Sequence, residues 1–414
     1  MMRVVIAFVW ALAVSSPAWA GNSDDKNGAG HTAQAGTVNF IVPNDVMTAF
    51  QNAAPSVKAK HCSAKNDYPY QELANLAQQP PKRLLGYNSR MDNRKDVPGA
   101  VETDLFVLRL TETFTDSWVS GSDEKRQKVL DALYAWAKAD ALTLTKPCAK
   151  DGYLLDSCTE WTQDDGQDLS DSKDHSTVQM HMMHIAYGYY FTLADYKADD
   201  PKHAVIQNWI NTFFKWNKRP TDVYIGLDLG WYWPAILQGA LENESELSEW
   251  HPKKLLTKAV RELDKVVLED GSIKDRTTRG NKSLWYHHTG LIETIVTLEM
   301  ARNYNVEIPE SLEQRIEKAG EIFIRGFEDH SYMDKWASKA HNSVFNPGEQ
   351  DFRDNLDIPN GNAWFYIFSY RYPNADFTRQ LDKILNQYPR NGRQDGYIGF
   401  GLGCIYAAAK EVGR

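Results

Sequence analysis

One ten-residue stretch, RGNKSLWYHH at residues 279–288, gathers the side chains with the most chemical potential. It holds an arginine, a lysine, a tyrosine and two adjacent histidines, directly before an apolar pattern that indicates a helix. A positive charge beside a tyrosine favours the tyrosinate form, which can remove a proton from a substrate. Arg279 and Tyr286 are therefore predicted to be a charge partner and an acid–base group.

The helix that follows must position these side chains. Ser283 or Asn281 is the expected N-cap. An apolar stripe follows helical spacing through Leu284, His288, Leu291, Ile295 and Leu298, with His287 beside it. The opposite, smaller and more polar face contains Tyr286, Gly290, Glu293 and Thr297. We therefore expect both histidines to be partly packed. The alternative is an ordinary surface tyrosine beside two core histidines.

The rest of the chain is predicted to be helical. Roughly eleven amphipathic helices are expected, at 100–119, 124–142, 178–196, 203–217, 233–245, 252–269, 283–304, 309–327, 362–373, 376–388 and 398–412. The best strand candidate is VNFIV at 38–42, which Pro43 would end. No fixed repeat is visible, which argues against a regular solenoid. We predict one all-α domain over 37–414, an α/α toroid (incomplete α/α barrel) of about a dozen antiparallel helices.

The N-terminus is predicted to direct export. Residues 1–20 combine a positive start, an apolar run and a small-residue cleavage site, as in a signal peptide. Residues 21–36 are small and polar, so we expect a flexible leader and a periplasmic protein. The apolar run is short for a membrane span, and no later stretch approaches that length. An uncleaved membrane anchor is the alternative.

Four cysteines allow three disulfide connectivities, and four free thiols are also possible. Cys148 and Cys158 close a short loop and could pair. Cys62 and Cys404 would then join the N-terminal region to the last helix. No Cys–His spacing resembles a zinc site, and no cofactor is predicted.

Composition indicates a globular protein, with 42% hydrophobic and 24% charged residues. The 13 Trp, 20 Tyr and 16 Phe residues supply rings on which sugars can stack. The net charge of −9 does not attract polyanions, so local basic groups must do so. The candidates are Arg83, Arg90, Arg94, Lys95, Lys274, Arg276, Arg279 and Lys282. Long polar loops at 84–99, 148–175 and 334–362 are candidate walls or lids.

Residues 279–310 resemble a motif of periplasmic alginate lyases of polysaccharide lyase family five. In that family an arginine precedes, by seven residues, the catalytic tyrosine of a Tyr-His-Asn triplet. Arg279 and Tyr286 keep this spacing, His287 matches the histidine, and His288 replaces the asparagine. Residues 362–373 resemble a second family helix, and 85–96 lie where the family has a tyrosine-bearing lid loop. The resemblance covers most of 60–390 and implies a helical toroid with polyuronate lyase activity.

The chain departs from this family at one motif. The family has Asn-His-Ser-Tyr-Trp some forty-five residues before the arginine, where this chain has DLGWYWPAIL at 228–237. Tyr232 and Trp233 align, but Leu229 and Gly230 stand at the asparagine and histidine positions. The usual carboxylate neutraliser and second base are therefore missing. The replacement candidates are His184, His181, Asn88, Arg90 and Asn281.

A polyuronate lyase cleaves by β-elimination, which needs a carboxylate neutraliser, a base for the C5 proton and an acid for the leaving O4. The predicted catalytic residues are Tyr286, Arg279, His287 and His184. The predicted substrate-binding residues are Tyr87, Asn88, Arg90, Tyr232, Trp233, Trp285, His288 and Trp364. One tyrosine can serve as base and acid where the C5 proton and O4 are syn. The gap at Gly230 thus favours mannuronate or glucuronate over guluronate.

Two other functions fit the same composition. A glycosidase on this fold would need paired carboxylates, for which EWTQDD at 160–165 and Asp228 are candidates. A non-catalytic polysaccharide-binding periplasmic protein would keep the aromatic side chains without depending on Tyr286. In each case the expected partner is a polysaccharide, with no nucleic acid, and the expected state is a monomer.

Overall fold

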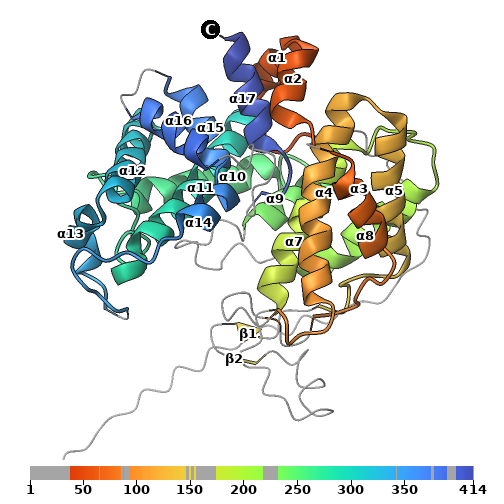
Figure 1. Ribbon diagram of the computed structural model, residues 1–414, viewed down its shortest axis with the longest axis horizontal. Coiled ribbons are helices and arrows are strands. Elements are labelled where there is room, and N and C mark those ends of the chain that lie inside the picture. Colours follow the sequence, from red (N-terminus) through yellow and green to blue (C-terminus); the bar gives the residue numbers. More distant parts are fainter. Residues whose placement is uncertain are drawn as a thin grey trace, which may run out of the picture. The chain divides into compact units, whose positions relative to one another are not determined.

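The computed structural model describes residues 38–64, 66–84, 87, 94–145, 149–150, 153–154, 174–217, 232–341, 343–373, 377–388 and 398–413. Residues 35–414 form one compact unit. Within the described ranges the chain is almost wholly helical (Figure 1). The β-structure there is an antiparallel pair, β1 (Ala149–Lys150) with β2 (Tyr153–Leu154), and a bridge between Val267 and Ile273. The predicted all-α class is confirmed.

The helices of the first half are α1 (Asn44–Asn52), α2 (Pro55–Cys62), α3 (Tyr68–Leu76), α4 (Ala100–Ser120), α5 (Asp123–Lys138), α7 (Asp174–Thr192) and α8 (Lys202–Asn217). Those of the second half are α9 (Tyr232–Leu241), α10 (Pro252–Val266), η3 (Gly280–Lys282), α11 (Ser283–Asn303), α12 (Glu310–Glu328), η4 (His330–Met333), α13 (Asp334–Ala337), α14 (Asp354–Asn360), α15 (Ala363–Arg371), α16 (Thr378–Gln387) and α17 (Leu402–Val412). Every helix expected from periodicity is present, with ends shifted by a few residues.

The predicted strand at 38–42 is wrong. The Asn39 side chain accepts hydrogen bonds from the backbone N–H groups of Ile41 (3.3 Å) and Val42 (2.9 Å). It thereby bends the chain into a turn that competes with extended structure. The apolar residues of this segment are nevertheless buried, because the turn inserts Phe40, Ile41 and Val42 into the core.

Helices α1, α2 and α3 were not predicted, because they are short and offer little periodic signal. In α2, whose sequence is PSVKAKHC, Cys62 is the buried residue. One turn of apolar contact is too little to produce the stripe by which longer helices are found. These helices are stabilised by what they pack against, since α1 and α2 both contact α17 (Figure 1).

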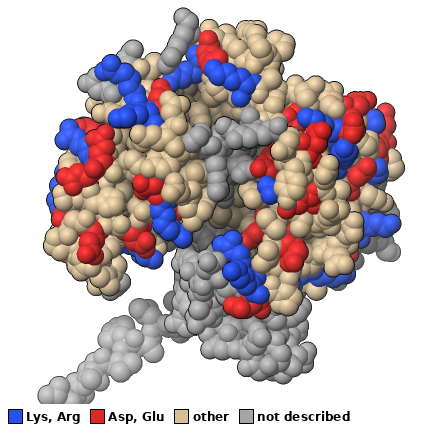
Figure 2. Space-filling model, in the orientation of Figure 1, with Lys and Arg blue, Asp and Glu red and all other residues tan. Residues whose placement is uncertain are grey.

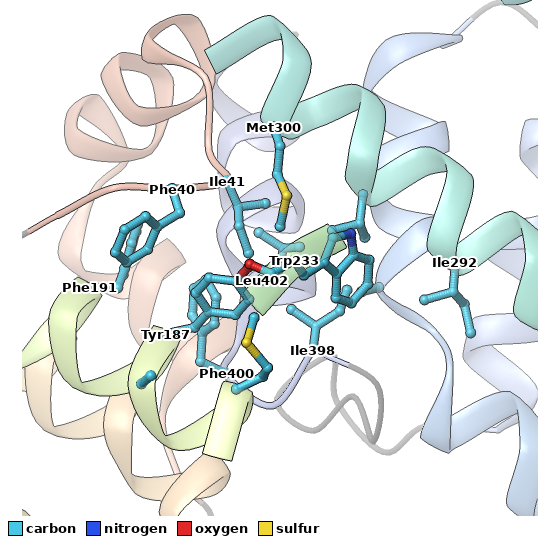
Figure 3. Packing of buried hydrophobic residues seen from close by; sticks show 14 of the residues in the cluster. Phe40, Ile41, Tyr187, Phe191, Trp233, Ile292, Met300, Ile398, Phe400 and Leu402 are labelled. Carbon is cyan, nitrogen blue, oxygen red and sulfur yellow. The ribbon is translucent and has the colours of Figure 1, made fainter. Parts of the chain in front are cut away.

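The C-terminal ends of α7 and α11 meet at the 38–42 segment. Val38 donates its N–H to the Tyr190 carbonyl near the end of α7 (3.0 Å). The Asn303 side chain, at the end of α11, donates to the Asn39 carbonyl (2.8 Å). Figure 3 shows Phe40 and Ile41 packed among side chains of both helices. The N-terminal halves of α7 and α11 therefore both extend away from this shared core.

A second link between these helices runs through α9. The Tyr187 hydroxyl on α7 donates to the Trp233 carbonyl (3.5 Å), and the Trp233 indole N–H donates to Thr297 Oγ1 on α11 (3.1 Å). Trp233 is buried and lies at the centre of the cluster in Figure 3. Trp233 thereby links α7 to α11 at Thr297.

A buried carboxylate joins several helices at the C-terminal end of α11. Glu299 is fully buried and forms ion pairs with Arg302 and, through two oxygens, with Arg371 of α15. It also accepts a hydrogen bond from the Tyr406 hydroxyl of α17. Arg371 in turn contacts Asp45 of α1 (2.8 Å). These contacts connect the first and last described helices to α11.

Of the pairings that the sequence left open, the structure contains the disulfide between Cys62 and Cys404, which joins α2 to α17. Cys148 and Cys158 lie outside the described residues, so their pairing stays a prediction. Disulfides persist in oxidising compartments, which is consistent with a secreted protein. Among the described helices, none combines the length and the apolar character that crossing a membrane requires.

Candidate functional site

Tyr286 lies in the first turn of α11, where its ring is partly buried. The guanidinium of Arg279 lies 4.9 Å from the ring centroid and that of Arg276 lies 5.7 Å away. Trp285 packs edge-on against the ring, with the two centroids 4.8 Å apart. The Tyr286 hydroxyl makes no hydrogen bond with any described residue. The phenol therefore combines partial exposure with two adjacent positive charges.

The predicted contact between Arg279 and Tyr286 forms because a 3-10 turn separates them. Arg279 precedes η3, and its backbone N–H donates to Ser283 Oγ at the start of α11 (2.9 Å). Its Nε donates to the Asp275 carbonyl (2.6 Å), which directs the exposed guanidinium over the tyrosine ring. The seven-residue spacing thus brings charge and phenol together through local geometry.

The turn before α11 is held by the loop at 343–353. Asn281 donates its backbone N–H to the Val344 carbonyl (2.8 Å), and its side-chain oxygen accepts from the Asn346 N–H (2.7 Å). Gly280 has a φ of 58°, and a Cβ there would lie 2.1 Å from the Val344 oxygen. This backbone contact requires glycine. The Asn281 amide oxygen is thus bound within the turn.

The expected N-cap of α11 by Ser283 or Asn281 is wrong. The helix begins at Ser283, and the first free N–H, that of Leu284, donates to the Gln350 side chain (2.9 Å). Gln350 lies more than sixty residues later in the chain. A capping group from so distant a loop leaves no local signal, so sequence patterns could not identify it.

His287 is a buried, fully bonded histidine. Its Nδ1 lies 2.8 Å from Thr277 Oγ1 and its Nε2 lies 2.9 Å from the Ala319 carbonyl. The carbonyl can only accept, so Nε2 carries the proton and Nδ1 accepts from the threonine. Burial lowers the pKa of His287 to about 4, which keeps the ring neutral. His287 therefore connects α11 to α12 and to the segment that bears Arg279.

His288 and Trp364 also lie in the core. The Trp364 indole N–H donates to His288 Nδ1 (3.1 Å), and His288 Nε2 lies 3.2 Å from the Asp357 carbonyl. Burial lowers the pKa of His288 to about 3. The His288 ring packs among Phe323 and Phe365, with centroids 5.1 and 5.9 Å away. His288 and Trp364, both predicted to bind substrate, therefore lie in the core, where they hold α11 against α14 and α15.

Acidification should destabilise the protein between about pH 6.5 and pH 4. Histidine in the unfolded chain titrates near 6.5, whereas burial holds the pKa of His287 at about 4 and that of His288 at about 3. The unfolded state binds more protons in this window, so the free energy of unfolding falls as the pH falls. The loss is up to about 1.4 kcal/mol per pH unit for each histidine.

Urea denaturation at a series of pH values measures this slope. His287→Gln should make it shallower, and the difference from wild type separates the histidine from carboxyl groups that titrate nearby. An identical slope in both proteins would show that His287 does not resist protonation.

The remaining aromatic candidates lie at different depths. Trp285 is partly exposed beside Tyr286, and its side chain hydrogen-bonds the Asp357 carboxylate. Trp233 is buried in the layer between α7 and α11. Tyr232 begins α9, and its side chain lies outside the described residues. The structure thus brings Trp285 together with Tyr286 and places Trp233 in the core.

A second polar cluster lies between the N-terminal part of α4 and the middle of α7. Asp104 accepts hydrogen bonds from the Tyr87 hydroxyl and from His181 Nε2, both at 2.8 Å, and Arg94 lies 3.6 Å away. Burial opposes ionisation of Asp104, but these partners outweigh it and lower its pKa. His184 is buried one turn further along α7, with its ring centroid 6.5 Å from that of His181.

Sequence reasoning missed Asp104, although its place near the start of a helix after a basic loop was a usable signal. Asn88, Arg90, Asp228 and the run 160–165 lie outside the described residues. Among the described side chains, no three or more His, Cys, Asp or Glu residues are grouped as a metal site requires.

Comparisons with known proteins place this geometry on a characterised fold. No family model and no curated protein matches the sequence. Among solved structures, the chain matches a tyrosine-to-phenylalanine variant of alginate lyase A1-III complexed with a tetrasaccharide, with a TM-score of 0.52 and 17% identity. The match covers 83% of this chain and 89% of that one.

Its fold is similar to that of alginate lyase A1-III. A histidine-to-alanine variant of A1-III in its apo form also matches, with a TM-score of 0.52, 17% identity and coverage of 82% of this chain and 89% of that chain. At this level of identity the likeness establishes the fold alone. The predicted α/α toroid is thereby confirmed, with Tyr286 in the first turn of α11 and Asp104 near the start of α4.

Proposed function

We propose that the protein is a polysaccharide lyase that cleaves an anionic polyuronate by β-elimination. The observation that carries the proposal is the partly exposed Tyr286, whose hydroxyl makes no hydrogen bond with the described residues and whose ring lies beside two guanidinium groups. The fold adds support, because its structural neighbours are alginate lyases and one was complexed with a tetrasaccharide. A toroid of this kind offers a site at the ends of its helices.

In the proposed reaction Tyr286 removes the C5 proton of the uronate as a general base. The C4–O4 bond then breaks, a C4–C5 double bond forms, and the same phenol returns the proton to the departing O4. Arg279 stabilises the negative charge that develops on the phenolate and on the substrate. His287 and His288, both neutral and buried, fix the first turn of α11 and hence the direction of the tyrosine ring.

The carboxylate neutraliser is proposed to come from α7. His181 and His184 lie near the middle of that helix, whose C-terminal end meets the C-terminal end of α11 at the 38–42 segment. A histidine N–H or imidazolium can bind the carboxylate and acidify the C5 proton. Asn88, Arg90 and Tyr232 remain proposed sugar contacts, whereas Tyr87, Trp233 and Trp364 would act indirectly because they are buried.

We propose a mannuronate- or glucuronate-type substrate, because one tyrosine serves both proton transfers when the C5 proton and O4 are syn. Attraction of the polyanion must be local. Lysine, arginine, aspartate and glutamate side chains are interspersed over the face drawn in Figure 2, so this face carries mixed charge. The basic groups beside Tyr286 are therefore the proposed binding site for the polyanionic substrate. We propose that the protein acts as a monomer in the periplasm.

The test is an assay with mannuronan, guluronan, glucuronan and a neutral glucan. Ultraviolet absorbance of the unsaturated uronate should rise with mannuronan or glucuronan and stay flat with the neutral glucan. New reducing ends without that absorbance would indicate a glycosidase, and binding without cleavage would indicate a carbohydrate-binding protein. Guluronan cleaved as fast as mannuronan and glucuronan would overturn the proposed substrate geometry.

A further inference from the structure

The face of α11 that contains Tyr286 also holds a buried arginine. Arg276 is 7% exposed and belongs to the segment between α10 and η3. Its Nη2 donates to both carboxylate oxygens of Glu293, at 2.8 and 3.1 Å. Its guanidinium carbon lies 5.7 Å from the Tyr286 ring centroid. Two residues of one helix face, two turns apart, thus contact the same cation.

Gly290 lies between Tyr286 and Glu293 on that face, and its lack of a side chain leaves room for Arg276. A Cβ on Gly290 would lie 3.2 Å from Arg276 Cγ and 3.5 Å from its Cβ, so the aliphatic stem of Arg276 crosses the helix where no side chain intervenes. Ile273 closes the other side, with its Cδ1 3.0 Å from the same point. Gly290 therefore permits the close approach, and Glu293 fixes the tip.

Arg276 and Arg279 differ in environment. Arg279 is exposed, and water and salt screen its charge, whereas Arg276 is enclosed by protein. The contacts of Arg276 hold its guanidinium at a fixed place beside the ring, whereas the guanidinium of Arg279 lies in solvent. Glu293 balances the charge of Arg276 and so offsets the desolvation cost of burying this cation. The same contact prevents the guanidinium from moving toward solvent.

We propose that Arg276, held by Glu293 across Gly290, is a positioning residue that fixes the Tyr286 ring and supplies its permanent positive neighbour. The assignment rests on the proposed lyase function for its catalytic consequence. Its structural part, that Arg276 determines the orientation and environment of Tyr286, stands on the contacts alone. Arg279 would then respond to bound substrate, while Arg276 keeps the phenol in place before substrate arrives.

The kinetic test uses Arg276→Met, Arg276→Lys and Gly290→Ala. Arg276→Met should lower kcat about 10- to 100-fold with KM little changed, because a group that acts mainly in the transition state affects kcat. Arg276→Lys should restore part of the rate, and Gly290→Ala should lower kcat several-fold by displacing the arginine without removing its charge.

A matched control is available on α12. Arg325 pairs with Glu321 and lies 5.5 Å from the Tyr332 ring centroid, so Arg325→Met removes a similar Arg–Glu–Tyr arrangement outside the proposed site. It should leave kcat unchanged. The proposal is overturned if Arg276→Met loses activity only in proportion to its unfolded fraction, with no rescue by lysine.

A substrate-free measurement separates this proposal from the lyase proposal. In protein labelled at tyrosine, the Tyr286 ring resonance is identified by its loss in Tyr286→Phe. It should shift in Arg276→Met and stay in place in Arg325→Met. If the wild-type protein shows no lyase activity but the Tyr286 resonance still shifts in Arg276→Met, the lyase proposal fails and the positioning role is supported. An unmoved resonance would overturn the positioning role whatever the activity.

Discussion

Replacing Tyr286 by phenylalanine should lower the rate of polyuronate cleavage by about 10³- to 10⁴-fold, because one hydroxyl is proposed to act as both base and acid. The substitution removes a single oxygen that makes no hydrogen bond with the described residues, so the fold should be unaffected. Substrate binding should change little, since Trp285 and Arg279 remain in place. Initial rates of unsaturated product, with oligosaccharide binding measured separately, would test this expectation.

Tyr332 provides the control for this experiment. It is also partly buried, and its ring lies 5.5 Å from Arg325 and 5.1 Å from Lys335. A tyrosine between two cations is therefore not sufficient to identify a catalytic group. Tyr332→Phe should retain full activity. Equal activity in Tyr286→Phe and wild type would remove the proposed base and leave the fold without an assigned catalytic residue.

Truncation of Glu299 to alanine should lower the free energy of unfolding by about 3–5 kcal/mol. Glu299 is fully buried and bonded to Arg302, Arg371 and Tyr406. Its removal leaves two arginines without their shared counter-charge, and the remaining partners, Glu313 for Arg302 and Asp45 for Arg371, offset only part of the desolvation cost. Glu299→Gln should lose less, because the amide keeps the volume and one acceptor. Urea denaturation of each variant would measure the differences.

The matched control for Glu299 is an exposed pair. Glu124 contacts Lys128 on the surface of α5 at 2.7 Å, and exposed pairs contribute little because water solvates both groups. Glu124→Ala should therefore leave the midpoint of unfolding unchanged. A loss in Glu299→Ala no greater than in this control would mean that the α11, α15 and α17 contacts hold without the buried carboxylate.

Both proposals depend on particular side chains. The sequence predicted the position of some of these side chains but not of others. Periodicity placed His287 and His288 on the packed side of α11 and Tyr286 on the opposite face with Gly290 and Glu293. The observed burial agrees for the two histidines and for the partly exposed Tyr286 and Glu293, but Gly290 and Thr297 on the opposite face are buried as well, because other segments pack against both sides of α11. The grouping of residues on each face of α11 could be predicted because residues three and four apart share a helix face whatever the tertiary structure is. The proximity of Arg279 and Tyr286 is local for the same reason.

Partners from distant segments could not be read in this way. Periodicity says that Glu293 faces away from the apolar stripe, but not that Arg276 lies along that face and pairs with it. Gln350 as the cap of Leu284 and Asp104 as the partner of His181 are contacts of the same kind. Each depends on which loops and helices pack together, and that choice is made by burial summed over the whole core.

The sequence by itself therefore determined the helical class, the packed position of the two histidines on α11 and the adjacency of charge and phenol at the start of that helix. It also limited the disulfide pairings to a few. Only the tertiary structure selected Cys62 with Cys404, turned the apolar 38–42 segment into a buried bend, and made the two histidines neutral supports. The physical reason is range, since helical periodicity is set by neighbours along the chain, whereas burial and long-range pairing are set by the packed whole.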